Sequence, residues 1–353
     1  MSKMLEEIRQ QPAALERTFR SEIKGIEKLR VLFAKNRPKF IVLAARGTSD
    51  NAAQFGRYLL EIATGIPVSL AAPSIFTLYG ARVDYKDALV VAISQSGEST
   101  DTNLVLERAR ECGAFTIGIT NEASSTLAKL AEHVILVRAG REKSVAATKT
   151  YTGQLMAVNM LAYALGAPVS LDELRALPDS VAGALKLEAE IREKSGRYRY
   201  MENAVVVGRG LNYANAYEWA LKLMETCYVV AERFSSADFL HGPIAMVEQS
   251  FPVFLFAPAG VTWPSIREMI ARVLNNLIGN AVKFAPKGGV VRVAATSDER
   301  GAQVSVSDNG PGIPAAQIPH LFDRFWQAPG QARKGSGLGL YICLLYTSDA
   351  ADE

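Results

Sequence analysis

Residues 39–50 have the sequence KFIVLAARGTSD, and this stretch decides the fold class. The run 39–45 is typical of a buried strand, and Gly47 allows a tight turn directly after it. The hydroxyl and carboxylate side chains that follow the glycine can cap the next helix. A buried strand that leads at once into a helix predicts a parallel sheet covered by helices on both faces.

The same alternation continues along the chain on both sides of this stretch. Residues 4–35 form an amphipathic helical lead with a break at Gln11-Pro12. Further apolar runs predict strands at residues 88–93, 114–120 and 133–137, with helices at residues 100–112 and 147–165. We therefore expect an α/β unit built on a parallel sheet.

A second copy of this unit follows a polar helical connector at residues 171–195. Residues 204–210 have the sequence AVVVGRG and repeat the strand and turn of residues 41–47, at an offset of 163 residues. A helix at 213–228 and a strand at 252–257 are expected next. Self-similarity at a fixed offset predicts a duplicated fold.

The second copy does not continue as the first one does. After the strand that ends at Ala257, a parallel sheet needs a crossover helix and a further strand. Instead, residues 261–264 (VTWP) lead into a long helix with a different pattern. We expect a truncated second copy, with one face of its sheet left without its usual helices.

Composition and charge exclude several classes of protein. Hydrophobic residues make up 49% and charged residues 21% of the 353 residues, as in ordinary soluble globular proteins, and the net charge of +3 is too small to indicate nucleic acid or a membrane surface. No apolar run approaches the ~20 residues of a spanning helix, and the start of the chain does not resemble a secretory signal. Cys112, Cys227 and Cys343 lack metal-ligand spacing, which favours a reducing, cytoplasmic location.

Residues 94–99, with the sequence SQSGES, follow a predicted strand and open a predicted helix. Their hydroxyl and amide groups can donate hydrogen bonds to phosphate oxygens, and the helix start adds backbone N–H groups and a positive dipole end. The carboxyl ends of parallel strands are also where such folds bind ligands. A polar capping loop without a ligand explains the pattern alone equally well.

Five separated motifs occur in one order on this duplicated unit, and together they resemble the sugar isomerase (SIS) family. They are Gly47-Thr48-Ser49, Ser94–Ser99, Val145–Lys149, Glu218–Glu225 and His241-Gly242-Pro243. The resemblance covers roughly residues 1–260 and is closest to the isomerase half of glucosamine-fructose-6-phosphate synthases and to SIS-type glucosamine-6-phosphate deaminases. It implies a sugar-phosphate ligand, no cofactor for this part, and a homodimer.

The resemblance also implies roles for individual residues. Glu225 matches the base that moves a proton between C1 and C2, and His241 matches the histidine that helps to open the sugar ring, often from a neighbouring subunit. Glu218 and Lys222 match supporting polar positions. The residues that match the phosphate-binding loops are Thr48, Ser49, Ser94, Gln95, Ser96 and Ser99.

The residue types suit an aldose–ketose shift. A carboxylate in a partly dry pocket can remove a proton next to a carbonyl group and return it one carbon away, and a histidine can transfer the ring-oxygen proton. Glu218, Lys222 and Glu225 recur at i, i+4 and i+7 and so share one helix face. Taken alone, the trio would be an exposed ion pair and His241 a core histidine. Because only a short helical lead precedes the unit, we expect an isomerase or deaminase rather than a glutamine-dependent synthase.

Residues 266–342 carry a second set of motifs. An asparagine-bearing helix, two strands (290–295 and 303–307), DNGPG at 308–312, LFDRF at 321–325 and GSGLG at 335–339 resemble the ATP-binding domain of sensor histidine kinases. By that resemblance Asn280 binds Mg²⁺, Asp308 accepts from adenine, and the glycines line the base and phosphates. The implied ATP-binding residues are Asn276, Asn280, Lys283, Asp308, Gly310, Gly312, Gly335, Gly337 and Gly339.

This second set of motifs lacks the phosphoacceptor histidine that a histidine kinase requires. None of His133, His241 and His320 opens a long charged helix before residue 266, so autophosphorylation is not expected. We hypothesise that the chain is a chimera of two unrelated reading frames, and we keep a kinase fragment and a non-catalytic sugar-phosphate sensor as alternative functions. The expected domains are a first SIS-like domain (1–195), a truncated second one (196–262), a partial α+β ATP-binding domain (263–342) and a non-native tail (343–353).

Overall fold

The computed structural model describes residues 2–241, 243, 252–298 and 301–310, and every structural statement below concerns these residues. The chain divides into two compact units, Met1–Arg199 and Tyr200–Glu353. Each unit is described by itself. The described part of the chain contains no helix long and apolar enough to cross a membrane.

The first unit begins with two helices, α1 (Lys3–Arg9) and α2 (Gln11–Lys35). The break between them confirms the one expected at Gln11-Pro12, because a proline fits the first turn of a helix and disrupts its interior. One face of α2 is buried in the first core, through residues such as Leu15, Phe19 and Ile26. The helical lead is therefore part of the first unit's core.

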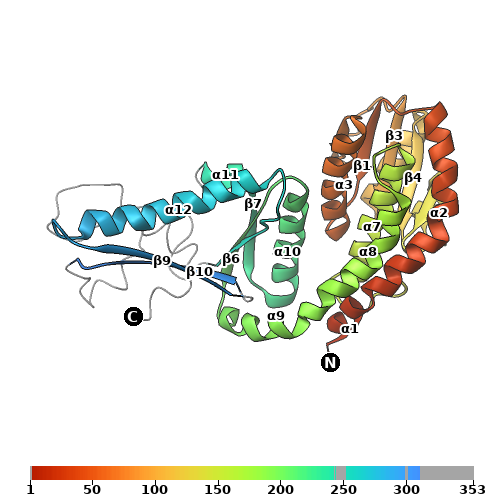
Figure 1. Cartoon of the computed structure of the whole chain (residues 1–353). Coiled ribbons are helices and arrows are strands. Elements are labelled where there is room, and N and C mark those ends of the chain that lie inside the picture. Colours follow the sequence, from red (N-terminus) through yellow and green to blue (C-terminus); the bar gives the residue numbers. More distant parts are fainter. Residues whose placement is uncertain (1, 242, 244–251, 299–300, 311–353) are drawn as a thin grey trace. The chain divides into compact units, whose positions relative to one another are not determined.

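A five-stranded parallel sheet with the order β2-β1-β3-β4-β5 forms the centre of the first unit (Figure 1). Four of its strands were expected, and the three-residue β2 was not. The strands are β1 (Phe40–Ala44), β2 (Val68–Leu70), β3 (Ala88–Ile93), β4 (Phe115–Thr120) and β5 (His133–Leu136).

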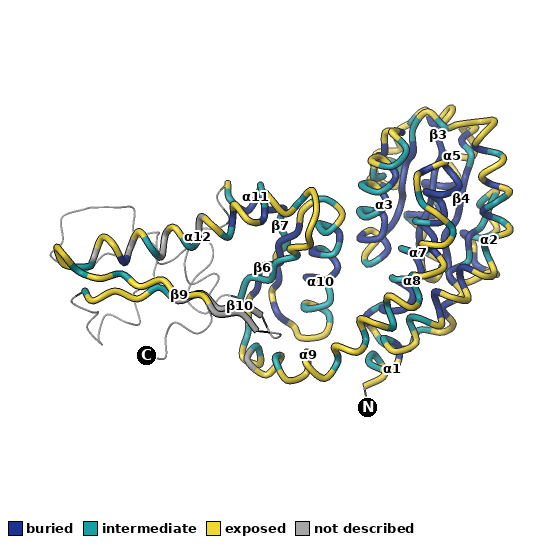
Figure 2. The backbone as a smooth tube through the Cα atoms, in the orientation of Figure 1, coloured by how far each residue is buried: buried dark blue, intermediate teal, exposed yellow. Residues whose placement is uncertain are grey.

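Helices cover both faces of this sheet, as the apolar strands predict. The side chains of Ile41 and Leu43 pack on one face against α2, α3 and α7, whereas those of Val42 and Ala44 pack on the other face against α5 and α6. Figure 2 shows the strands as a buried layer between these helices. The helices are α3 (Thr48–Thr64), α4 (Ser74–Thr77), α5 (Thr100–Glu111), α6 (Thr126–Leu130) and α7 (Lys149–Ala164).

The expected polar connector is helical. It consists of α8 (Leu171–Ala184), α9 (Glu188–Lys194) and the short 3₁₀ turns Leu185–Leu187 and Ser195–Tyr198. The side chain of Ser170 caps α8 and the Glu173 carboxylate accepts from the Ser170 N–H, which together form a capping box. Leu174 of α8 still belongs to the first core, whereas α9 has no buried residue.

The second unit repeats the beginning of the first. Its parallel sheet has the order β7-β6-β8, with β6 (Asn203–Gly208), β7 (Val230–Ser235) and β8 (Val253–Leu255) in the places of β1, β2 and β3. Gly47 precedes α3 with φ 58° and ψ −134°, and Gly210 precedes α10 (Leu211–Cys227) with φ 60° and ψ −131°. The two turns have the same backbone conformation, which confirms the duplication.

The expectation that one face of the second sheet lies uncovered is wrong. On one face, Ala204 and Val206 of β6 pack against α10. On the other face, Val205 and Val207 pack against α11 (Ser236–Leu240) and against Ile266, Met269 and Ile270 of α12. These three residues share one helix face, so the first turns of α12 (Trp263–Phe284) cover the sheet where a crossover helix was expected.

The part of the chain after α12 changes to antiparallel structure. Strands β9 (Val291–Asp298) and β10 (Gly301–Asp308) form a two-stranded antiparallel sheet in which Asp298 pairs with Gly301 and Val291 pairs with Asp308. Both strands were expected, although each is longer than the sequence indicated. Among the described residues, the five-stranded sheet of the first unit therefore has a three-stranded counterpart, which a helix and two antiparallel strands follow.

Candidate functional site

In the loop between β3 and α5, three serine side-chain oxygens accept hydrogen bonds from backbone N–H groups. The Ser94 Oγ accepts a hydrogen bond from the Gly97 N–H at 3.1 Å, and the Ser96 Oγ accepts from the Glu98 N–H at 3.2 Å. Ser99 caps α5 by accepting from the Thr102 N–H at 3.4 Å. Because these oxygens are acceptors within the loop, the hydroxyl protons of Ser94 and Ser96 remain for a ligand. Gln95 and Ser96 are exposed and Ser94 is buried.

Gly97 fixes the shape of this loop. Its φ is +68°, a conformation that favours glycine, and a Cβ atom there would lie 2.2 Å from the Ser125 Oγ. The neighbouring Glu98 carboxylate accepts from the Thr126 hydroxyl at 2.7 Å and from the Thr126 N–H at 2.9 Å, which lowers the pKa of Glu98. The loop is therefore tied to the start of α6 before any ligand arrives.

The turn between β1 and α3 brings Thr48 and Ser49 to the same edge of the sheet. Ser49 is buried in the first turn of α3, and its Oγ accepts a hydrogen bond from the Gln154 Nε2 of α7 at 2.9 Å. Next to it, Arg46 pairs with Asp101 of α5, with 2.9 Å between Nη2 and Oδ2. The two predicted phosphate loops thus lie at the carboxyl ends of the adjacent strands β1 and β3, joined by this ion pair.

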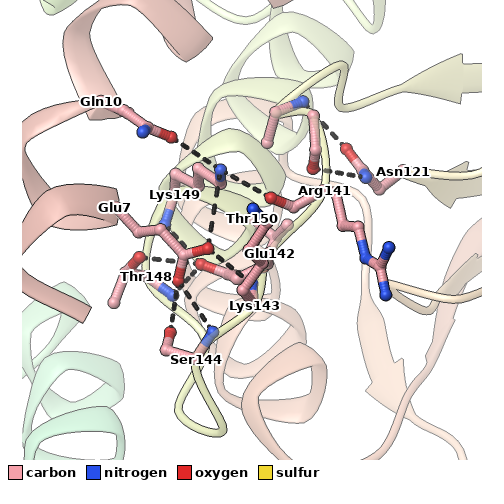
Figure 3. A network of polar contacts seen from close by, with 12 residues as sticks. Glu7, Gln10, Asn121, Arg141, Glu142, Lys143, Ser144, Thr148, Lys149 and Thr150 are labelled. Atoms are coloured by element: carbon pink, nitrogen blue, oxygen red, sulfur yellow. Dashed lines mark hydrogen bonds and ion pairs between the residues drawn. The ribbon is translucent and has the colours of Figure 1, made fainter. Parts of the chain in front are cut away.

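A third segment at this edge, residues 141–149, is held by two carboxylates (Figure 3). The Glu7 carboxylate accepts from the Lys143 N–H, the Ser144 N–H and the Ser144 hydroxyl at 2.5, 3.0 and 2.6 Å. The Glu142 carboxylate accepts from the Thr148 N–H at 2.6 Å and from the Lys149 N–H at 3.0 Å. The helical lead therefore anchors the segment that opens α7.

Lys149 lies buried within this network. Its Nζ donates to the Gln10 Oε1 at 2.8 Å and to the Arg141 carbonyl oxygen at 2.9 Å, and it lies 3.9 Å from the Glu7 Oε1. Burial alone would raise the pKa of Glu7, but the hydrogen bonds from Ser144 and Lys143 and the charge of Lys149 outweigh burial and lower it. Glu7 is therefore held as a buried carboxylate.

The predicted catalytic carboxylates lie together on α10. The Lys222 Nζ lies 2.6 Å from the Glu225 Oε2 and 3.3 Å from the Glu218 Oε1. The exposed fractions of the side chains rise along the helix, from 9% for Glu218 to 16% for Lys222 and 31% for Glu225. This cluster is half-buried rather than an exposed surface pair, and Glu225 is its most accessible member.

His241 belongs to a different element from this cluster. It follows α11, is exposed, and donates its backbone N–H to the Asp238 carbonyl oxygen at 3.1 Å. Helices α10 and α11 pack on opposite faces of the second sheet. Among the described residues, no hydrogen bond or ion pair joins His241 to Glu225.

The predicted ATP-binding residues are described only in part. The Asp308 Oδ1 at the end of β10 accepts from the Gly310 N–H at 2.8 Å, and Lys283 is exposed near the end of α12. Asn276 and Asn280 lie on α12, but their side chains lie outside the described part of the chain. Gly312, Gly335, Gly337 and Gly339 lie wholly outside it.

Two long-range contacts of the site were not predicted from the sequence. Gln154 contacts Ser49, a predicted phosphate-binding residue 105 positions away, and Glu7 accepts a hydrogen bond from Lys143, which lies 136 positions later. Neither belongs to a local motif. The one signal for Gln154 in the sequence is its polar side chain at the start of the largely apolar stretch 154–165.

Two families match the chain. The SIS domain family matches residues 36–164 and 199–278, and the family of histidine kinase-, DNA gyrase B-, and HSP90-like ATPases matches residues 266–351. The ranges overlap at residues 266–278, on the same helix that covers the second sheet. The first match accounts for both parallel sheets.

Curated relatives are isomerising aminotransferases. The chain is 33% identical over 313 residues to the glutamine–fructose-6-phosphate aminotransferase (isomerizing) of Pyrococcus horikoshii, which covers 86% of this chain and 49% of that protein. It is 36% identical over 273 residues to the protein of the same name from Methanothermobacter thermautotrophicus, which covers 76% and 45%. The chain thus spans about half the length of these relatives.

Solved structures agree with this fold. The C-terminal domain of glucosamine-fructose-6-phosphate aminotransferase from Francisella tularensis is 30% identical and matches with a TM-score of 0.69, over 77% of this chain and 81% of that one. Glucosamine-6-phosphate deaminase from Thermotoga maritima matches with a TM-score of 0.64 over 76% and 81%. At 23% identity, the second likeness supports the fold alone.

Proposed function

The chain belongs to the SIS domain family, and we propose that its SIS part binds a sugar phosphate and interconverts aldose and ketose forms. The proposed substrate is an amino-sugar phosphate such as glucosamine 6-phosphate, as the names of the relatives suggest. The observation that carries the proposal is the half-buried cluster on α10, in which Lys222 contacts both Glu218 and Glu225.

We assign the binding of the substrate's phosphate group to residues of the first unit. The protons of Ser94 and Ser96 and the N-termini of α3 and α5 offer donors of the kind that a phosphate dianion accepts. These groups are largely fixed by hydrogen bonds within the protein before a ligand binds. Binding therefore requires little reorganisation of the loops.

The proton transfer is assigned to Glu225. It is the most exposed carboxylate of its cluster, and its contact with Lys222 holds it in one position. In the proposed reaction Glu225 removes a proton from the carbon next to the carbonyl group and returns it to the adjacent carbon. Glu218 is buried and holds Lys222 from the other side.

Replacing Glu225 tests this assignment. Glu225→Gln keeps the shape of the side chain but removes the base, so we expect kcat for glucosamine 6-phosphate to fall by about 100-fold or more while KM changes little. Fructose 6-phosphate and ammonia are the products to assay, and they should form in equal amounts, because the isomerised C2 imine takes up water and releases both. Glu232→Gln, on the exposed part of β7, is the matched control and should leave both constants unchanged. Binding without any turnover by the unaltered chain would instead support a sugar-phosphate sensor.

We also propose that the SIS part acts as a homodimer in which His241 of one chain serves the site of the other. The placement of α10 and α11 on opposite faces of one sheet supports this arrangement. The histidine then transfers the ring-oxygen proton, whereas Glu225 acts on carbon.

Mixing two inactive variants tests the homodimer. If each site combines Glu225 of one chain with His241 of the other, a mixed dimer of Glu225→Gln and His241→Asn regains one intact site. We expect refolded equimolar mixtures to recover about one quarter of wild-type activity, because half of the dimers are mixed. Mixtures as inactive as the separate variants would contradict the shared site.

The C-terminal part carries a second candidate function, the binding of ATP with Mg²⁺, which rests on the matched residues 266–351. Among the described residues no group of three or more His, Cys, Asp or Glu could hold a metal. The donors assigned to Mg²⁺ are asparagine amides on α12, and they fit an ion held mainly by nucleotide phosphates. Asp308 would accept from the adenine amino group, with its carboxylate already oriented by Gly310.

A further inference from the structure

We propose that Gln154 is a positioning residue of the phosphate site, because it makes Ser49 a hydrogen-bond acceptor and so directs the Ser49 hydroxyl proton toward the ligand. The inference rests on the proposed sugar-phosphate function and deepens it. It concerns the contact between α7 and the first turn of α3, where the Gln154 Nε2 lies 2.9 Å from the Ser49 Oγ.

The environment of Gln154 is unusual for an amide. The residue is 1% exposed, yet its Oε1 has no hydrogen-bond partner among the described residues. Buried amide oxygens are nearly always paired, and an unpaired one destabilises the fold. A residue that only filled space at this position would be apolar. Among the described residues, the hydrogen bond of this amide goes from its Nε2 to the Ser49 Oγ.

The side-chain oxygens of two other serines in the proposed site also accept a hydrogen bond from the protein. The hydroxyl oxygens of Ser94 and Ser96 each accept a backbone N–H from their own loop, at 3.1 and 3.2 Å. Ser49 receives its hydrogen bond from a side chain, that of Gln154. In all three cases the serine oxygen is occupied by a donor and the hydroxyl proton remains to be given to a phosphate oxygen. Gln154 thus does for Ser49 what the loop backbone does for the other two.

A second buried amide supports the pattern. Asn103 of α5 donates its Nδ2 to the Gly97 carbonyl oxygen at 3.1 Å, and its own Oδ1 has no partner among the described residues. Both amides therefore present N–H groups to a phosphate loop and leave their oxygens unpaired. If the Gln154 amide were flipped, the Ser49 hydroxyl would donate to Oε1. Its proton would then not be available for a hydrogen bond to the phosphate.

The test compares the affinity of the full-length chain for inorganic phosphate, measured from the ligand-dependent rise of Tm, so that no turnover is required. Gln154→Met removes the donor at nearly constant volume, and we expect it to weaken phosphate binding about tenfold, as one charge-assisted hydrogen bond predicts. Gln154→Glu offers Ser49 an acceptor instead, and should weaken binding further. Asn159→Leu is the matched control, because this amide of α7 makes its hydrogen bond among the described residues to the Leu155 carbonyl oxygen of its own helix.

A double-mutant comparison separates positioning from packing. If Gln154 acts through Ser49, the variant carrying both Ser49→Ala and Gln154→Met binds phosphate as weakly as Ser49→Ala alone. In turnover of glucosamine 6-phosphate, Gln154→Met should raise KM and leave kcat unchanged. Additive losses of affinity, or a lowered kcat at constant KM, would overturn the inference.

Failure of the inference is distinguishable from failure of the proposed function. If the wild-type chain binds phosphate and Ser49→Ala weakens it while Gln154→Met does not, the inference is wrong and the phosphate site stands. If the wild-type chain binds neither phosphate nor glucosamine 6-phosphate, the phosphate site and the role of Gln154 both fall.

Discussion

Glu7 is a buried residue of the helical lead that accepts hydrogen bonds from a segment 136 positions later. Its folded pKa lies below the value of 4.5 for an unperturbed carboxyl group, since the hydrogen bonds and Lys149 outweigh the effect of burial. A lowered folded pKa contributes stability that is present above the unfolded pKa and is lost as the pH falls through the folded pKa. The contribution of Glu7 should therefore be constant near neutral pH and disappear in acid.

Glu7→Gln tests this linkage. We expect the variant to lose about 2 kcal/mol of unfolding free energy at pH 7, the size of a charged hydrogen bond. The difference from the wild type should shrink below about pH 4.5, where the unfolded carboxyl group takes up its proton. Denaturant titrations of both proteins between pH 3 and pH 7 measure the difference, with the exposed Glu6→Gln as control. A difference that stays constant into acid would contradict a charged role for Glu7.

Single residues also mark the limit of sequence-based prediction. The spacing of Glu218, Lys222 and Glu225 placed them on one face of a helix, and the structure shows them in contact. The partners of Glu7 and Ser49 could not be found in this way, because no period or motif links residues more than 100 positions apart. The chemical roles proposed for the site residues remain predictions.

Among the elements, the strands that escaped prediction share one physical cause. β2 has three residues, of which only Val68 is buried, and β7 carries Glu232 and Arg233 in its middle. Both are edge strands, so tertiary pairing rather than an apolar run makes them strands. The central strands β1, β3 and β6 are buried nearly throughout, and their sequences predicted them.

Helix α12 is the element whose packing differs most from the prediction made from the sequence. Ile266 and Met269 are fully buried and contribute to the core on one face of the second sheet. The Ser265 hydroxyl also lies 2.8 Å from that of Ser236 in α11. A helix that the sequence assigned to the ATP-binding part thus belongs at its start to the packing of the SIS part.

Shortening the buried side chains of α12 tests this packing. Ile266→Ala and Met269→Ala should each lower the unfolding free energy of the second unit by about 2–5 kcal/mol, since each leaves a cavity in a small core. Arg267→Ala, on the exposed face of the same turn, is the control and should have little effect. Thermal unfolding measures all three. If both core variants unfolded like Arg267→Ala, α12 would not pack on the second sheet.

At the scale of the whole molecule, the chain contains two copies of one α/β fold, and the second copy has the smaller parallel sheet. In the part of the chain that the structure describes, the first copy has five parallel strands and the second has three, with the same order around β1 and β6. The strand and glycine turn that recur at an offset of 163 residues predicted this duplication. The substitution of α12 for a crossover helix could not be predicted, because only the folded arrangement shows which apolar face meets the uncovered sheet.

The first unit should survive proteolysis as one piece. Its sheet is covered on both faces within Met1–Arg199, whereas α9 has no buried residue and offers little resistance to local unfolding. We expect brief trypsin treatment of the native chain to cut first between Arg192 and Arg199 and to leave a fragment of nearly the whole first unit, identified by intact mass. Arg20, exposed on α2, is an internal control that should stay uncut because its helix is anchored in the first core. Early cleavage at Arg20, or loss of both units at the same rate, would show that the first unit is not independently stable.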